Sequence, residues 1–82
     1  MMIVWDEPKR LANLDKHGLD FADLSLDFFS TAVIRPAKRG RQQAIGRLED
    51  GTIAVIFLLL GSQGLSVISM RPANVQERRL IR

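Results

Sequence analysis

The stretch WDEPKRLANLDKHGLDF, residues 5–21, carries the signals that start and stop a helix. Asp6 has the short carboxylate that caps a helix N-terminus, and Pro8 is tolerated in a first helical turn. Gly18 adopts the left-handed backbone that ends a helix at little cost. The stretch therefore predicts one short helix between Asp6 and Gly18, with His17, the single histidine of the chain, in its last turn.

The flanking residues predict a strand before this helix and a second helix after it. Met2–Trp5 is a short apolar run, and Leu11 and Leu14 share one face of the first helix. Beyond Gly18, Asp20 is placed to cap the second helix. Its inward face recurs at spacings of three and four residues, at Phe21, Leu24 and Phe28.

After Ser30 the sequence changes to strand-like segments separated by turns. The expected strands are Ala32–Arg35, Gln42–Leu48, Thr52–Leu60 and Leu65–Met70, with a basic loop at 37–41 and turns at 49–51 and 61–64. The continuously apolar third of these is expected at the centre, covered on both faces. Arg71-Pro72 is expected to end the last strand, and Ala73–Ile81 has helical composition. The prediction is one α+β domain over residues 1–82, in which an N-terminal strand and two helices precede a three- to four-stranded antiparallel meander sheet and a C-terminal helix.

Composition excludes several classes of protein. The 82 residues include no cysteine, so neither disulfides nor thiolate metal sites are available. The start MMIVWDEP lacks the basic and apolar regions of a signal peptide. The longest apolar run, at 53–60, is far shorter than the roughly 18 residues that a membrane span requires. We therefore expect a soluble cytoplasmic protein with no membrane association.

The net charge of +3 is unevenly distributed. Residues 1–40 hold six basic and six acidic side chains, whereas residues 41–82 hold six arginines and three acids. The planar guanidinium suits phosphate better than the point charge of lysine. A solvated surface and a surface for an anionic or nucleic-acid partner explain this excess equally well.

Nine positions of the opening stretch follow the pattern W-D-x-x-K-x-x-x-N-x-x-K-H-G-hydrophobic-x-F. Arg41 with Ile45-Gly46, and Val67–Arg71 with Glu77-Arg78, continue the pattern along the chain. In these residues the chain resembles the BrnT family of type II toxins. It departs from the family pattern at Gly40, Gln42 and Pro72.

The resemblance implies a RelE-like ribonuclease fold and a toxin that blocks translation. It also implies a BrnA-like antitoxin partner with a DNA-binding ribbon-helix-helix domain, which covers the toxin in a hetero-oligomer. The substrate implied is RNA.

Metal-free RNA cleavage uses the 2′-hydroxyl as nucleophile, and it requires a base, an acid and cations around the phosphate. His17 is the one side chain with an unperturbed pKa near neutrality, so it is the candidate acid or base. Its alternative role is to complement the helix dipole. Arg47 and Arg71, near strand ends, are the candidate phosphate clamp, because antiparallel strands can bring them to one face. Both are equally well explained as exposed strand-rim arginines.

Further RNA or phosphate contacts are predicted at Lys16, Arg41 and Arg78, with solvated charge as the alternative. Glu77 is expected to pair with Arg78, and Asn13 to fix a backbone turn. One histidine and no cysteine predict no metal site and no cofactor.

Three functions compete at this point. The first is a metal-independent endoribonuclease toxin with His17, Arg47 and Arg71 as catalytic residues. The second is a catalytically weak or inactive toxin-fold module that only binds its antitoxin. The third is a small basic nucleic-acid-binding domain, although no aromatic-rich strand of the single-strand-binding type is present.

Overall fold

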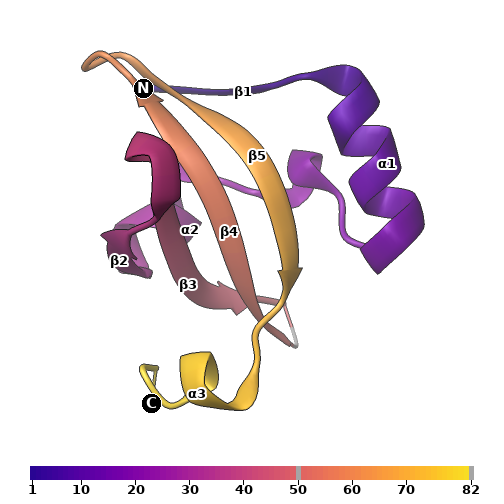
Figure 1. Ribbon diagram of the computed structural model, residues 1–82, viewed down its shortest axis with the longest axis vertical. Coiled ribbons are helices and arrows are strands. Elements are labelled where there is room, and N and C mark those ends of the chain that lie inside the picture. The colour runs from indigo at the N-terminus through magenta and orange to yellow at the C-terminus, as the bar shows by residue number, and fades with distance from the viewer. Residues whose placement is uncertain (50, 82) are drawn as a thin grey trace.

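A twisted five-stranded sheet organises the computed structural model, which describes residues 1–49 and 51–81 (Figure 1). The strands are β1 (Met2–Trp5), β2 (Val33–Pro36), β3 (Gln42–Leu48), β4 (Gly51–Leu60) and β5 (Gly64–Pro72). The helices are α1 (Glu7–His17), α2 (Leu26–Thr31) and α3 (Val75–Arg78), with single 3₁₀ turns η1 (Phe21–Asp23) and η2 (Lys38–Gly40). The predicted α+β class is confirmed.

The strand order is β1-β5-β4-β3-β2. β2 to β5 form the predicted antiparallel meander, and β4 lies at its centre. β1 adds a fifth strand that runs parallel to β5, with Met2 opposite Gly64 and Trp5 opposite Val67. A parallel pair needs a crossover, and here α1 begins directly after β1 and packs on β5.

The hydrophobic core lies between one face of the sheet and the segment from α1 to α2. Its buried side chains from that segment are the three predicted ones, Phe21, Leu24 and Phe28. The sheet contributes Ala44, Ile53, Val55, Phe57, Leu65, Val67 and Met70. Gly46 is required by this packing, because a Cβ there would lie 2.8 Å from Cε1 of Phe28.

Both boundaries of α1 are as predicted. The Asp6 carboxylate accepts a hydrogen bond from the Lys9 amide, and Gly18 ends the helix at φ 68°. Leu11, on the face it shares with Leu14, is 52% exposed, so this face is covered only in part. Asn13 is the buried residue of this helix: its amide donates to the Leu19 carbonyl and accepts from the Met70 amide. Asn13 therefore ties α1 to β5.

Three expected elements differ in extent. The second helix is divided into η1 and α2, because Ser25 begins a new helix by accepting from the Phe28 amide. β5 continues through Pro72 rather than stopping at Met70. The C-terminal helix is confined to Val75–Arg78.

β4 is central, but its end is not covered on both faces. Leu59 and Leu60 are 44% and 45% exposed. The predicted turn at 49–51 includes residue 50, which lies outside the described residues. Across the described part of the chain, no helix has the length and apolar character to cross a bilayer.

Candidate functional site

The sheet face opposite the core carries a polar row that crosses four strands. Paired residues of antiparallel strands point to the same face, and the register aligns Arg35, Gln43, Ile56 and Ser69 across β2, β3, β4 and β5. The neighbouring row is Val33, Ile45, Ala54 and Arg71. The two rows form the floor of the candidate site.

One end of the polar row opens into a hollow of about 340 Å³ between α1 and β5, which we call the helix hollow. Lys9, Lys16 and His17 line it from α1, and Ile68 and Ser69 line it from β5. His17 is half-buried in this wall. The helix hollow therefore holds the single imidazole beside two ammonium groups.

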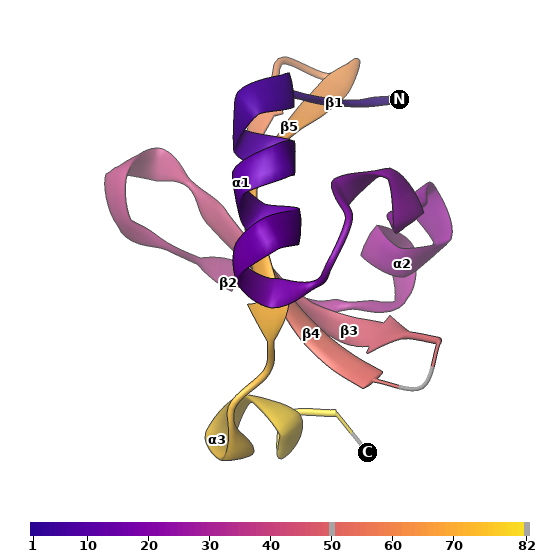
Figure 2. The same ribbon diagram turned by 90° about the vertical axis from the view of Figure 1, so that its right-hand side faces the viewer.

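The other end opens into a hollow of about 560 Å³ at the β2–β3 hairpin, which we call the hairpin hollow. Arg35, Lys38 and Arg41 supply its cations, and Gln43 and Ile56 lie at its base. In Figure 2 this hairpin bends out on one side of the sheet while α2 lies on the other. The basic hairpin thus stands on the side away from the core.

A buried carboxylate links the two rows. The Glu77 side chain is 4% exposed and is bound by both terminal nitrogens of Arg71, at 2.7 Å and 2.9 Å. Its Oε2 accepts from Gln43 Nε2 at 3.1 Å, and its Oε1 accepts from the Asn74 amide at 2.9 Å. The hydrogen bonds from Arg71 are the main reason that the pKa of Glu77 falls to about 2. Glu77 is therefore an anion throughout the neutral range.

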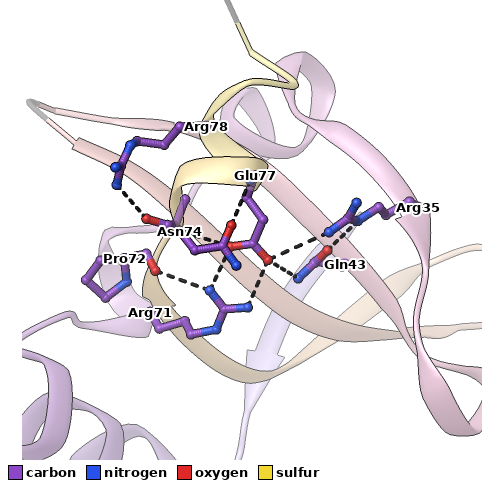
Figure 3. A network of polar contacts seen from close by, with 8 residues as sticks. Arg35, Gln43, Arg71, Pro72, Asn74, Glu77 and Arg78 are labelled. Carbon is purple, nitrogen blue, oxygen red and sulfur yellow. Dashed lines mark hydrogen bonds and ion pairs between the residues drawn. The ribbon is translucent and has the colours of Figure 1, made fainter.

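Figure 3 shows Arg71 and Arg35 approaching Glu77 from two sides, while Arg78 points away. Arg35 Nε donates to Gln43 Oε1 at 2.6 Å, and Arg35 Nη2 lies 3.7 Å from Glu77 Oε2. Arg78 donates to the Ala73 carbonyl instead, so the expected pair between Glu77 and Arg78 is replaced by one between Glu77 and Arg71. The side chains of Arg35 and Arg71 remain 46% and 42% exposed, so each can also contact a ligand.

The structure brings some predicted site residues together and separates others. Lys16 and His17 share the helix hollow, and Arg71 lies two residues from Ser69 on the same strand face. Arg47 shares that face but sits on β3 opposite Thr52, with β4 between it and Arg71. Arg47 and Arg71 are therefore not adjacent, and the predicted clamp of both arginines on one phosphate does not form. Arg41 lines the hairpin hollow, and Arg78 lies on α3.

Sequence reasoning missed four residues of this face: Arg35, Lys38, Gln43 and Glu77. For Glu77, the sequence predicted only a local pair with Arg78. Gln43 carried a usable signal, because a polar residue in the middle of a predicted strand has to find partners if it is buried. It is 8% exposed and hydrogen-bonded at both ends of its amide.

Trp5 is partly buried and packs against the core. Its ring lies edge-on to Phe21, with 6.4 Å between centroids, and its Nε1 donates to Glu7. Within residues 1–49 and 51–81, no cluster of three or more histidines or acids is arranged to hold a metal ion.

Two comparisons with known proteins agree. A family profile described as "Ribonuclease toxin, BrnT, of type II toxin-antitoxin system" matches residues 5–77. The crystal structure of the Brucella abortus ribonuclease toxin, BrnT, is 56% identical and superposes with a TM-score of 0.86. That match covers 90% of this chain and 97% of the Brucella chain. No curated protein matches the chain.

Proposed function

Because this chain belongs to the BrnT family of ribonuclease toxins of type II toxin–antitoxin systems, we propose that it cleaves RNA, without a metal, on the face that runs from the helix hollow to Arg71. The observation that carries this proposal is the meeting of the single imidazole with a cationic face: His17 and Lys16 line one hollow with Ser69, and Arg71 lies two residues further along β5.

The reaction is an internal transfer. A base removes the proton of the 2′-hydroxyl, the 2′-oxygen forms a bond to phosphorus, and the bond to the 5′-oxygen breaks. An acid donates a proton to that leaving oxygen. His17 serves as either the base or the acid, since an imidazole exchanges its proton near neutral pH.

Arg71 stabilises the negative charge that grows on the phosphate. The two hydrogen bonds from Arg71 to the Glu77 carboxylate fix the orientation of the guanidinium before RNA binds. Glu77 is accordingly a positioning residue. Arg47, set apart by β4, contacts a different phosphate of the same RNA strand. Lys16, Arg41 and Arg78 add RNA contacts around this face.

In the cell, this activity inhibits translation in the cytoplasm until a BrnA-like ribbon-helix-helix antitoxin binds in a toxin–antitoxin hetero-oligomer. Exposed apolar side chains at the β4–β5 tip and on the adjoining start of β1 favour a partner surface, with Leu60 45% and Met2 68% exposed.

The test is to express the native chain and its His17→Ala, Arg71→Ala and Arg47→Ala variants separately in a bacterium, and to follow growth and total RNA. Loss of an acid–base group should slow cleavage by about 10²–10⁴-fold, so His17→Ala should abolish growth arrest. Arg71→Ala should do the same, Arg47→Ala should weaken the arrest, and Arg79→Ala, an exposed arginine, is the matched control.

Growth arrest and RNA loss that persist in folded His17→Ala and Arg71→Ala proteins would contradict the site. Unimpaired growth with a folded native chain would instead favour a module that only binds its antitoxin.

A further inference from the structure

We propose that the hairpin hollow is a second phosphate-binding subsite, which holds the RNA backbone away from the bond that is cleaved. This inference deepens the proposed function and rests on it for the identity of the ligand. It concerns Arg35 and Lys38, neither of which takes part in the cleavage site proposed above.

The hairpin hollow concentrates positive charge. Arg35, Lys38 and Arg41 line it together, and residues 31–48 contain no acidic side chain. The one carboxylate nearby, Glu77, is buried and bound on both oxygens by Arg71. Lys38 and Arg41 take part in none of the ion pairs within the described residues. The hollow therefore presents net positive charge to a ligand.

Arg35 is held in place before any ligand binds. Gln43 accepts from its Nε at 2.6 Å, and the other end of the Gln43 amide donates to Glu77 at 3.1 Å. This series of hydrogen bonds fixes one edge of the Arg35 guanidinium and leaves the side chain 46% exposed above the hollow. A guanidinium already oriented in this way loses less conformational entropy when it binds a phosphate.

The ligand that fits best is the backbone of a single RNA strand. The helix hollow and the hairpin hollow lie at opposite ends of the row from Ser69 to Arg35. Three strand spacings separate these ends, about 14 Å, which requires an oligonucleotide rather than one nucleotide. The floor between them is Ile56, which offers no ring on which a base can stack. The contacts therefore favour the phosphate backbone without sequence preference.

The test measures binding without cleavage. The probe is a ten-nucleotide RNA whose 2′-hydroxyls are methylated, so that the nucleophile is blocked. Its affinity for the 82-residue chain is followed by fluorescence anisotropy at several salt concentrations. Lys38→Ala should weaken binding by about fivefold. It should also reduce the slope of log affinity against log salt by about 0.7, the value for one phosphate contact on a single strand.

Two further variants sharpen the result. Arg35→Lys keeps the positive charge but removes the planar guanidinium that Gln43 orients. It should therefore weaken binding of the same RNA, with Arg71 left unmutated. Arg39→Ala is the matched control, because Arg39 has the same charge in the same hairpin but lines neither hollow. It should leave affinity and salt slope nearly unchanged.

An unchanged affinity and slope in folded Lys38→Ala and Arg35→Lys would overturn the subsite. So would an equal loss in Arg39→Ala, which would reveal only long-range attraction. A loss of binding to an antitoxin partner with RNA affinity intact would overturn it as well, since the surface would then serve a protein. The binding measurement is independent of turnover, so a failure of His17 or Arg71 to support cleavage would leave this result standing.

Discussion

Two clusters of arginine and carboxylate differ in their surroundings although their chemistry is the same. In the first, which we call the helix cluster, Arg10 binds both oxygens of Glu7 at 2.8 Å and reaches Asp20 at 3.0 Å. In the second, the Glu77 cluster, Glu77 binds Arg71, Gln43 and the Asn74 amide. The helix cluster joins α1 to the nearby η1 cap, whereas the Glu77 cluster joins β3, β5 and α3.

The pKa values alone do not distinguish the two clusters. The pKa of Glu7 and that of Glu77 both fall to about 2, in each case chiefly because an arginine donates hydrogen bonds. The exposed fraction does distinguish them, since the Glu7 side chain is 56% exposed and that of Glu77 is 4% exposed. Water can replace the partners of Glu7 but not those of Glu77, so equal pKa shifts predict unequal effects on folding.

The largest expected effect is that of Glu77→Ala on stability. Removing one partner of a buried ion pair costs about 3–5 kcal/mol, and the half-exposed arginines place this variant at the lower end, about 3 kcal/mol. Urea unfolding followed by circular dichroism measures the loss. Glu7→Ala is the matched control and should scarcely move the midpoint, because Arg10 keeps Asp20 and water.

Equal losses in Glu77→Ala and Glu7→Ala would break the comparison. That result would mean that burial does not decide the strength of these pairs.

The second largest expected effect is the loss at low pH of the stability that the Glu77 cluster provides. The folded pKa of Glu77 is lowered from 4.5 to about 2, so the stabilisation that it provides is present above about pH 4.5 and is lost as the pH falls towards 2. We expect Glu77→Gln to be less stable than the native chain at neutral pH by about 1–2 kcal/mol, and the gap to close through this window. Urea midpoints recorded across the window measure the gap.

A gap that stays constant from neutral pH to about pH 2 would show that the charge of Glu77 contributes nothing and that only its shape matters. Lys38→Ala serves as a control whose stability relative to the native chain should not change across the same window.

Much of the fold was readable because its signals are local. The cap at Asp6, the stop at Gly18 and the burial of Phe21, Leu24 and Phe28 each depend on residues a few positions apart, and each was predicted correctly. The single helix expected for the last three residues is divided into η1 and α2. The limits of the C-terminal helix were not readable, since composition does not show that Asn74 and Glu77 begin a helix of only four residues.

The site was less readable because its contacts join distant residues. Gln43 and Glu77 are 34 positions apart and meet only once β3 and α3 are assembled. Arg71 was selected as a phosphate ligand from its place near a strand end, yet its partner Glu77 was assigned to Arg78. Arg35 was missed because its role depends on Gln43, on the neighbouring strand.

The smallest expected effect concerns the caps that begin the helices near each cluster. Asn74 accepts from the Glu77 amide at 2.8 Å while Glu77 accepts from the Asn74 amide, so this cap also orients the buried carboxylate. Asp6 accepts from the Lys9 amide at 3.3 Å and holds no buried group.

Losing a cap costs about 1 kcal/mol. Asn74→Ala should therefore lose at least this much stability, while Asp6→Ala should lose less. Asn74→Ser, which keeps an acceptor, should recover most of the loss in urea unfolding. If Asp6→Ala proves the more damaging, then α3 is held by Arg71 and Gln43 alone, and the cap adds nothing to the placement of Glu77.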